Sequence, residues 1–252
     1  MRKNHFLYPI MLFLINIALA LSGCADPRDS QSIVSSVISA HGGERYQSSI
    51  IEFDFRGRHF QVERSGGLFT YQRTFEDTAG AISDVLNNQG FCRKINGEQA
   101  RLSEREKTRF SSSVNSVVYF ALLPYSLNDQ AVQKRYLGTS AIKGEPYHKI
   151  EVSFQKEGGG KDYSDVFTYW FHQEKLTLDY LAYRFHRDGG GTRFREAFNQ
   201  RRINGILFAD YHNYKGAESD TSTVDYDQRF EAGQLAKVSE VILENIDVKI
   251  LK

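Results

Sequence analysis

A two-residue alternation of apolar and polar side chains runs through most of the chain and limits its fold to a largely β architecture. The alternation covers residues 51–62, returns at 69–75, 82–87 and 91–95, and resumes after Val132. About ten such strands with few helices exclude a doubly wound α/β sheet. We predict a mainly β (α+β) fold: a single strongly curved antiparallel sheet or open barrel of about ten strands wrapped around a long amphipathic helix.

Two segments follow the helical period instead. The first has its apolar residues between Ile33 and Ile38 and stops at Gly42-Gly43. The second is predicted over residues 104–122, where Ser103 and Glu106 match a capping box and an apolar stripe follows. This second helix is long and one-sided, so we expect it to lie on a concave apolar surface.

The N-terminus has the parts of an export signal. Arg2 and Lys3 precede an apolar run over residues 6–21, which is too short and too interrupted for a membrane span of about 20 residues. The run ends in the sequence LSGC at Leu21–Cys24, which resembles the lipobox of bacterial lipoproteins. The resemblance implies cleavage before Cys24 and acylation there, and two or three acyl chains make a stable anchor. The alternative is an ordinary secretory peptide with a chance cysteine.

The remaining chain is nearly neutral and has no disulfide available. Residues 1–23 hold two of the 32 basic residues and no acidic one, which leaves 30 basic against 31 acidic residues. This balance excludes nucleic acid as a partner. Cys24 is assigned to the lipid, so Cys92 has no intrachain partner. No Pro/Ser-rich linker is present, and we predict a signal peptide (1–23), a tether (24–30) and one monomeric domain (31–252).

Three segments resemble a strand-turn-strand pattern of the lipoprotein-carrier superfamily, the LolA/LolB-like fold: residues 136–138, 142–152 and 169–171, followed by Leu178. In that superfamily a bent antiparallel sheet wraps helices and forms an apolar cavity. Four shorter motifs look like an uncharacterised lipoprotein family of Bacteroidota. These motifs are His41-Gly42-Gly43, Tyr71-Gln72-Arg73, Leu122-Leu123-Pro124-Tyr125 and Asp179-Tyr180-Leu181-Ala182-Tyr183. That family implies no known activity, and the fold alone transfers none.

Four charged residues break the apolar faces of predicted strands. They are Arg73, Arg93, Asp165 and Glu196, with Tyr71 and Tyr169 on the faces of Arg73 and Asp165. An inward charge costs several kcal/mol unless it is paired or hydrated. If the strands curl into one cavity, these six residues are the candidate binding site for an amphiphile with a polar head. The alternative is a structural Arg/Glu pair, or strand ends that reach water.

Three arginines on neighbouring predicted strands form a second candidate. Arg184 lies opposite Tyr183 on its strand, while Arg193 and Arg195 lie opposite Phe194. Two or three such guanidinium groups can clamp a carboxylate or phosphate in bidentate fashion. The more common arrangement is cross-strand pairing with acids on a solvated face.

No catalytic motif is present. The chain lacks HExxH and G-x-S-x-G sequences, and Cys92 has no identifiable activating base. The pairs Asp210/His212 and Asp162/Asp165 supply too few ligands for zinc or calcium. We therefore predict no catalytic residues, no metal and no cofactor. A hydrolase with paired carboxylates is the enzymatic alternative, with Asp165, Asp179 and Glu196 as candidates.

These patterns together predict a lipid-anchored envelope protein that binds a lipid or another apolar ligand in a cavity enclosed by the sheet. We expect the anchor in the outer membrane, facing the periplasm, because Ala25 rather than aspartate follows Cys24. Aspartate after the acylated cysteine is a retention signal of enterobacterial lipoprotein sorting. A structural or partner-binding lipoprotein with a filled core is the main alternative.

Overall fold

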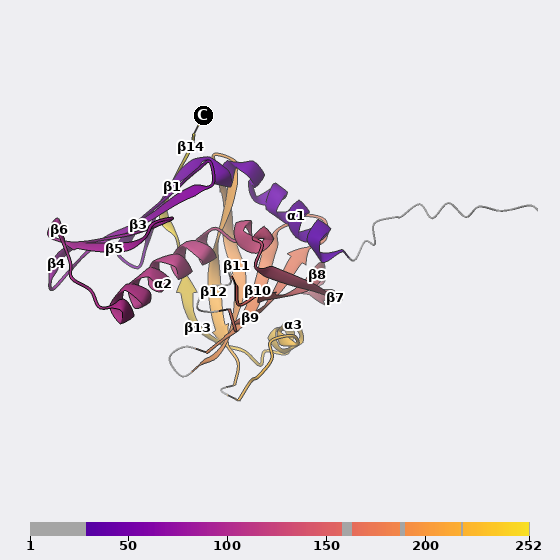
Figure 1. The fold of residues 1–252 in the computed structure, drawn as a ribbon. Helices are drawn as coiled ribbons and strands as arrows, with labels where there is room; N and C mark the ends of the chain where they lie inside the picture. The colour runs from indigo at the N-terminus through magenta and orange to yellow at the C-terminus, as the bar shows by residue number, and fades with distance from the viewer. Residues whose placement is uncertain (1–28, 158–162, 187–189, 218, 252) are drawn as a thin grey trace, which may run out of the picture.

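A computed structural model describes residues 29–157, 163–186, 190–217 and 219–251. The strands form two antiparallel sheets, with helix α2 between them, and α1 and α3 lie against the second sheet (Figure 1). The helices are α1 (Ser30–His41), α2 (Glu104–Ala121) and α3 (Tyr226–Glu231), with the short 3-10 helices η1 (Gly43–Gln47) and η2 (Tyr125–Asn128).

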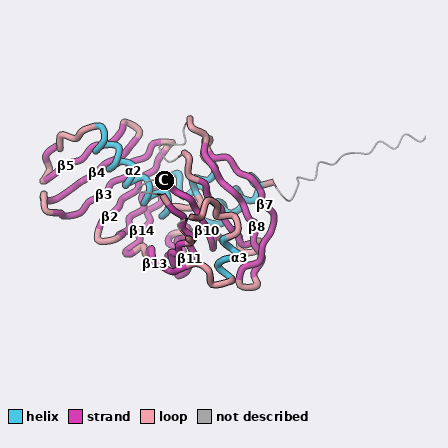
Figure 2. Tube along the Cα trace, turned by 90° about the horizontal axis from the view of Figure 1, so that it is seen from below, coloured by secondary structure: helices cyan, strands magenta, loops and turns pink. Residues whose placement is uncertain are grey.

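Each sheet has seven strands, and Figure 2 shows the two groups on opposite sides of the molecule. Sheet A has the order β14-β1-β2-β3-β4-β5-β6, with β14 (Glu244–Ile250), β1 (Ser49–Phe55), β2 (Arg58–Ser65), β3 (Leu68–Asp77), β4 (Gly80–Asn87), β5 (Gly90–Ile95) and β6 (Glu98–Gln99). Sheet B has the order β13-β12-β11-β10-β9-β8-β7, with β13 (Ala236–Val241), β12 (Ile206–Lys215), β11 (Gly191–Ile203), β10 (Leu178–Phe185), β9 (Val166–His172), β8 (Glu145–Phe154) and β7 (Val132–Ile142).

The prediction of a mainly β fold is confirmed, but the prediction of a single sheet of about ten strands is wrong. The chain leaves sheet A after β6, passes through α2, and begins sheet B with β7. Strongly twisted sheets rarely exceed about ten strands without splitting or curling. The described strands do not close into a barrel. Local alternation identifies strands and does not reveal which of them pair, so it could not show this division.

Sheet A buries one face, as its alternating sequence requires. Ile51 and Phe53 of β1 point inward, and the neighbouring strands continue this face with Phe60 and Val62. The face packs against α2, whose Val114 belongs to the same apolar cluster. Sheet A is therefore a half-buried layer with α2 as its cover.

The middle strands of sheet B are buried on both faces, which explains the near-continuous apolar sequence of β9. On one face Tyr169 and Phe171 pack with residues of α1. On the other face Trp170 and Phe194 pack with Tyr226 of α3. A strand covered on both sides has no polar face, so its sequence does not show which side a given residue occupies.

Helix α2 begins with the predicted capping box. The Ser103 Oγ accepts a hydrogen bond from the Glu106 backbone N–H (3.3 Å), and the Glu106 carboxylate accepts one from the Ser103 N–H (2.9 Å). Helix α1 ends at Gly42, which has a φ of 150°. A Cβ at Gly42 would lie 3.1 Å from side-chain atoms of Ile206 and Tyr46, so the glycine permits close packing of α1 on sheet B.

A hydrogen-bonded corner carries the chain from sheet B into sheet A between β13 and β14. The Leu243 N–H donates to Asp210 Oδ1 (2.9 Å), and the Leu243 carbonyl accepts from Arg201 Nη2 (2.6 Å). Arg201 also forms an ion pair with Asp210 (3.1 Å). Asp210, a candidate metal ligand in the sequence, therefore fixes a turn of the backbone.

Several predicted features lie outside the described residues: the signal peptide (1–23), Cys24, Ala25 and Asp162. Of the predicted tether, Asp29 and Ser30 are described, as the N-cap and first residue of α1. Within the described ranges, no helix combines the length and hydropathy that a bilayer span requires.

Candidate ligand-binding pocket

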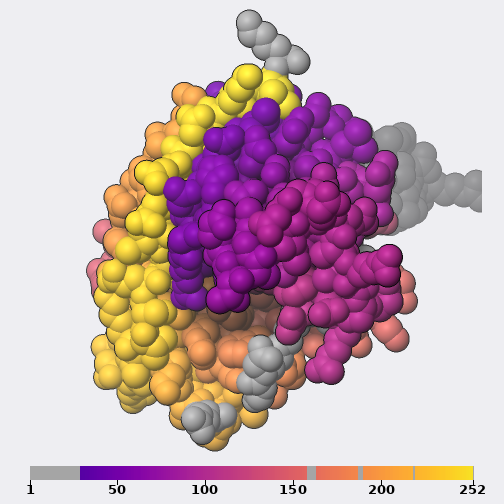
Figure 3. Space-filling view, turned by 90° about the vertical axis from the view of Figure 1, so that its left-hand side faces the viewer, coloured from indigo at the N-terminus to yellow at the C-terminus, as the bar shows by residue number. Residues whose placement is uncertain are grey.

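A pocket of about 830 Å³ lies between the two sheets beside α2. All seven strands of sheet B reach it, and β12 contributes Ala209, Tyr211 and Asn213 at alternating positions. Sheet A contributes residues that include Phe55 and Tyr71. Figure 3 shows the hollow between the N-terminal strands with α2 and the orange strands of sheet B. The pocket thus occupies the junction between the layers.

Aromatic rings form much of the wall nearest sheet B. Phe120 of α2 lies 5.2 Å from Tyr183 between ring centroids, and Phe167 lies 5.4 Å from Tyr183. Tyr119 also lines the pocket, and its hydroxyl is 3.0 Å from the hydroxyl of Tyr169 behind it. Burial raises the pKa of Tyr119 above its ordinary value, so this hydroxyl stays protonated. The wall is apolar with a few fixed hydroxyl groups.

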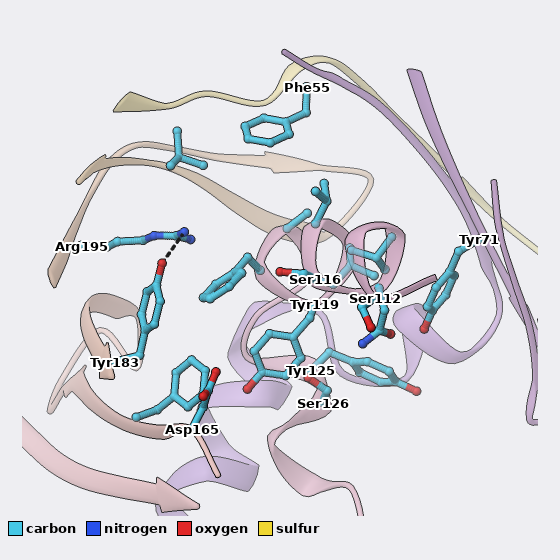
Figure 4. A pocket seen from close by; sticks show the side chains of 18 of the residues that line it. Phe55, Tyr71, Ser112, Ser116, Tyr119, Tyr125, Ser126, Asp165, Tyr183 and Arg195 are labelled. Carbon is cyan, nitrogen blue, oxygen red and sulfur yellow. Dashed lines mark hydrogen bonds between the residues drawn. The ribbon is translucent and has the colours of Figure 1, made fainter. Parts of the chain in front are cut away.

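Arg195 marks one side of the pocket and is only 9 % exposed. Its Nη2 donates to the Tyr183 hydroxyl (3.1 Å), and its guanidinium carbon lies 4.0 Å from the ring centroid of Phe120. Figure 4 shows Arg195 and Tyr183 together, with Tyr71 across the pocket and residues of α2 between them.

Arg64 lies on the Tyr71 side. It donates from Nη2 to the Tyr71 hydroxyl, and its guanidinium carbon is 4.8 Å from the ring centroid of Tyr125. Asp129 lines the same pocket; burial raises the pKa of this carboxyl group, while Arg64 and Lys134 act to lower it. The charged residues lining the pocket are Arg56, Arg64, Arg193 and Arg195 against Asp129 and Asp165, which gives a net positive wall.

Two of the six predicted binding residues line the pocket. Tyr71 and Asp165 do so, and Asp165 Oδ1 is 3.3 Å from Nδ1 of His186. Tyr169 lies one layer behind, in contact with Tyr119. A ligand-binding role for Tyr71 and Asp165 stays a prediction.

Arg73 and Arg93 instead meet around Asp84, which is not among the residues predicted from the sequence. Arg73 donates to Asp84 Oδ2 from Nε (3.0 Å) and Nη2 (2.6 Å), and Arg93 donates to Oδ1 from Nε (2.6 Å). Asp84 is fully buried. Arg93 also faces the Phe110 ring at 3.5 Å, and Arg73 donates to the Ser113 hydroxyl. This triad forms a buried structural ion cluster away from the pocket wall.

Glu196 lies on the other face of sheet B. It forms an ion pair with Lys143 and accepts a hydrogen bond from the Tyr214 hydroxyl (3.0 Å). The expected meeting of Arg73, Arg93, Asp165 and Glu196 in one cavity is therefore not found. Their strands belong to different sheets or present them to opposite faces, which local alternation does not distinguish.

The three-arginine cluster divides across sheet B. Arg184 donates to the Thr221 carbonyl (3.3 Å), while Arg193 and Arg195 line the pocket. Cross-strand pairing on a solvated face is not the arrangement of Arg195, because α2 covers its face of the sheet.

Asp84 could have been identified from the sequence, because it alternates with Ile82 and Leu86 on β4 and lies opposite Arg73.

The hydrolase candidates do not form a catalytic pair around the pocket. Asp165 lines it, Glu196 is on the opposite face, and Asp179 accepts hydrogen bonds from Tyr147 and Gln200. Among the described residues, no three His, Cys, Asp or Glu side chains gather as a metal site. Cys92 is a free, half-buried thiol.

A family model described as "Family of unknown function (DUF6503)" matches residues 10–244. The chain belongs to this family. The match covers nearly all of the fold described above, including every strand of sheet B. No curated protein matches the chain in sequence. The Bacteroidota source suggested by the motifs stays a prediction.

Solved structures similar to this DUF6503 family member include three bacterial proteins. A LolA superfamily protein from Nitrosomonas europaea has a TM-score of 0.47 at 11% identity, covering 88% of this chain and 93% of that one. A DUF1329 family protein from Desulfovibrio piger has a TM-score of 0.48 at 11% identity, covering 87% and 90%. A putative outer membrane lipoprotein-sorting protein domain from Vibrio parahaemolyticus has a TM-score of 0.43 at 9% identity, covering 72% and 84%.

LolA-superfamily and lipoprotein-sorting proteins are thus among the structures that this chain resembles, as its sequence motifs predicted. At TM-scores below 0.5, these similarities do not indicate an activity for this chain. The functional proposal therefore depends on the pocket.

Proposed function

We propose that this protein is a lipid-anchored envelope protein that binds a lipid or another amphiphile in the pocket between its sheets. The observation that carries the proposal is the pocket of about 830 Å³ with aromatic walls and a few convergent polar groups. Small-molecule sites typically measure ~300–1,000 Å³ and have this mixture of surfaces. A structural lipoprotein with a filled core would have no pocket of this size at the junction of its layers.

The wall chemistry favours an amphiphile over a fully apolar or fully polar ligand. Phe120, Phe167 and Tyr183 offer apolar contact area, which contributes about 25 cal/mol per Å² when a ligand covers it. Arg195 and Arg64 place charges at separate sides of the same pocket, because Arg64 donates to the hydroxyl of Tyr71, which lies across the pocket from Arg195 (Figure 4). A ligand with an apolar chain and a polar end matches both surfaces.

Blocking the pocket tests the proposal. In Ala209→Trp, an indole replaces a methyl group on the pocket face of β12. We expect this variant to bind the neutral apolar dye N-phenyl-1-naphthylamine at least tenfold more weakly than the unmodified protein. The assay uses protein beginning at Ala25, which keeps every described residue, and follows dye fluorescence during titration.

The matched control is Ala236→Trp, the same change at an exposed position of β13 outside the pocket. This variant is expected to bind the dye as the unmodified protein does. Urea unfolding of both variants checks that the fold is intact. Equal dye binding by Ala209→Trp and Ala236→Trp would place the binding site elsewhere and contradict the proposal.

We also propose that Cys24 carries the lipid and that the anchor lies in the outer membrane, on the sequence grounds of the LSGC motif and Ala25. Cells grown with an alkyne analogue of palmitate are expected to label the full-length protein. Cys24→Ser is expected to abolish this label. Cys92→Ser is expected to retain it, because only Cys24 comes directly after the predicted export signal. Persistent labelling of Cys24→Ser would exclude the lipoprotein assignment.

A further inference from the structure

We infer that the ligand carries an anionic head group, a carboxylate or a phosphate, and that Arg195 binds it. This inference rests on the proposed function and names the chemistry of the ligand's polar end. Its basis is a buried guanidinium group on the pocket wall whose Nε–H has no acceptor among the described residues.

The described residues leave Arg195 without an ionic partner. Its Nη2 donates to the Tyr183 hydroxyl, while its Nε is buried and has no acceptor. The guanidinium faces the rings of Phe120 and Tyr183, with its carbon 4.0 Å and 5.3 Å from their centroids. Ring faces attract the cation but do not replace oxygen acceptors at its edge.

A buried charge in this state is costly unless something accepts its protons. Leaving a buried donor without an acceptor is costly, and more so when the donor is charged. An arginine edge matches two oxygen atoms of a carboxylate or phosphate. A head group beside Tyr183 would therefore satisfy Arg195, and the binding of an anion would remove a cost that the unliganded protein carries.

The other pocket charges support the assignment to Arg195. Arg193 lines the same face of sheet B, so the local field is positive. The two pocket carboxylates lie with other groups: Asp165 is 3.3 Å from His186, and Asp129 lies within the electrostatic influence of Arg64 and Lys134. Arg64 thus has an acid nearby, whereas Arg195 has none among the described residues.

The surroundings of Arg195 also select an amphiphile over a free anion. Phe120 and Tyr183 flank the guanidinium and continue into the aromatic wall through Phe167. An anion without a chain would leave this surface uncovered. A single chain with an anionic end would contact both.

The test compares ligands that differ only in the head group. Dodecanoate, dodecyl phosphate and dodecanol each compete with N-phenyl-1-naphthylamine at pH 8, using protein beginning at Ala25. We expect both anions to displace the dye at concentrations about tenfold lower than dodecanol, as a charged hydrogen bond implies. In Arg195→Met the three competitors are expected to act within about threefold of one another, with dye binding retained.

Arg184→Met provides the matched control, because Arg184 lies on the neighbouring strand but does not line the pocket. It is expected to keep the preference for anions. If Arg195→Met does not fold, Arg195→Lys serves instead. Lysine keeps the charge and lacks the planar edge, so it is expected to lower the preference and to retain part of it.

The outcomes separate this inference from the proposed function. Equal displacement by dodecanoate and dodecanol in the unmodified protein overturns the anionic head group while the pocket remains a binding site. An unchanged preference in Arg195→Met overturns the role of Arg195. Displacement by acetate or inorganic phosphate alone would show a small-anion site and contradict an amphiphile at Arg195. Failure of the dye itself to bind contradicts the proposed function.

Discussion

Asp84→Asn is expected to destabilise the protein by about 3–5 kcal/mol. The substitution removes the carboxylate that pairs with two buried guanidinium groups, those of Arg73 and Arg93. The amide keeps the shape of the side chain but loses the negative charge that Arg73 and Arg93 both contact. The two cations would then repel each other in surroundings where water reaches neither well. Urea denaturation followed by circular dichroism measures the change.

Asp247→Asn is the control for this prediction. Asp247 is exposed on β14, also in sheet A, so the same substitution is expected to change stability by less than about 0.5 kcal/mol. A loss below about 1 kcal/mol in Asp84→Asn would show that the cluster is hydrated and contributes little.

The second prediction concerns stability in acid. His41 is only 4 % exposed, and its Nε2 accepts a hydrogen bond from the Leu178 N–H (3.1 Å). An acceptor nitrogen must be unprotonated. Burial, together with the nearby charge of Arg202, lowers the pKa of His41 to about 3. The folded protein therefore holds this ring neutral at pH values where an unfolded chain protonates it.

The direction of the pH effect follows from these two states. Below the ordinary histidine pKa of about 6.5, the unfolded chain binds a proton that the folded protein does not, so stability falls as the pH falls. His41 alone is expected to cost about 2 kcal/mol between pH 7 and pH 5. Above the ordinary histidine pKa its contribution levels off.

His41→Gln isolates this contribution. The variant is expected to be less stable at pH 7, yet to lose about 2 kcal/mol less than the unmodified protein between pH 7 and pH 5. Parallel pH curves for His41→Gln and the unmodified protein would contradict the assignment.

Local sequence patterns predicted the elements well where one face is buried and the other is wet. The alternation around Ile51 and Phe60 identified β1 and β2, and the Ser103/Glu106 pair located the start of α2. These features depend on residues close in sequence. The division into two sheets depends on which strands pair, and the pairing of β1 with β14 has no local signature.

The candidate site was harder to predict for the same reason. Arg73 breaks an apolar face of its strand and Arg195 lies on the polar face of its own, yet Arg73 belongs to a structural ion cluster and Arg195 lines the pocket. Asp84 explains the first, and the position of α2 over sheet B explains the second. Both explanations require knowing what packs on a strand, and the middle strands of sheet B are covered on both faces.

The pairing of β1 with β14 also constrains the order of events in folding. The Ser48 hydroxyl donates to the Leu251 carbonyl across 203 positions of sequence, beside the register that joins Ser49 to Ile250. During synthesis the N-terminal strand emerges first, and its outer edge has no partner until residues 244–250 follow. Contacts this distant in sequence form slowly, and an unpaired edge can capture other chains. The outer edge of β1 therefore stays open until the last strand of the chain arrives, and β14 then becomes the edge of sheet A in its place.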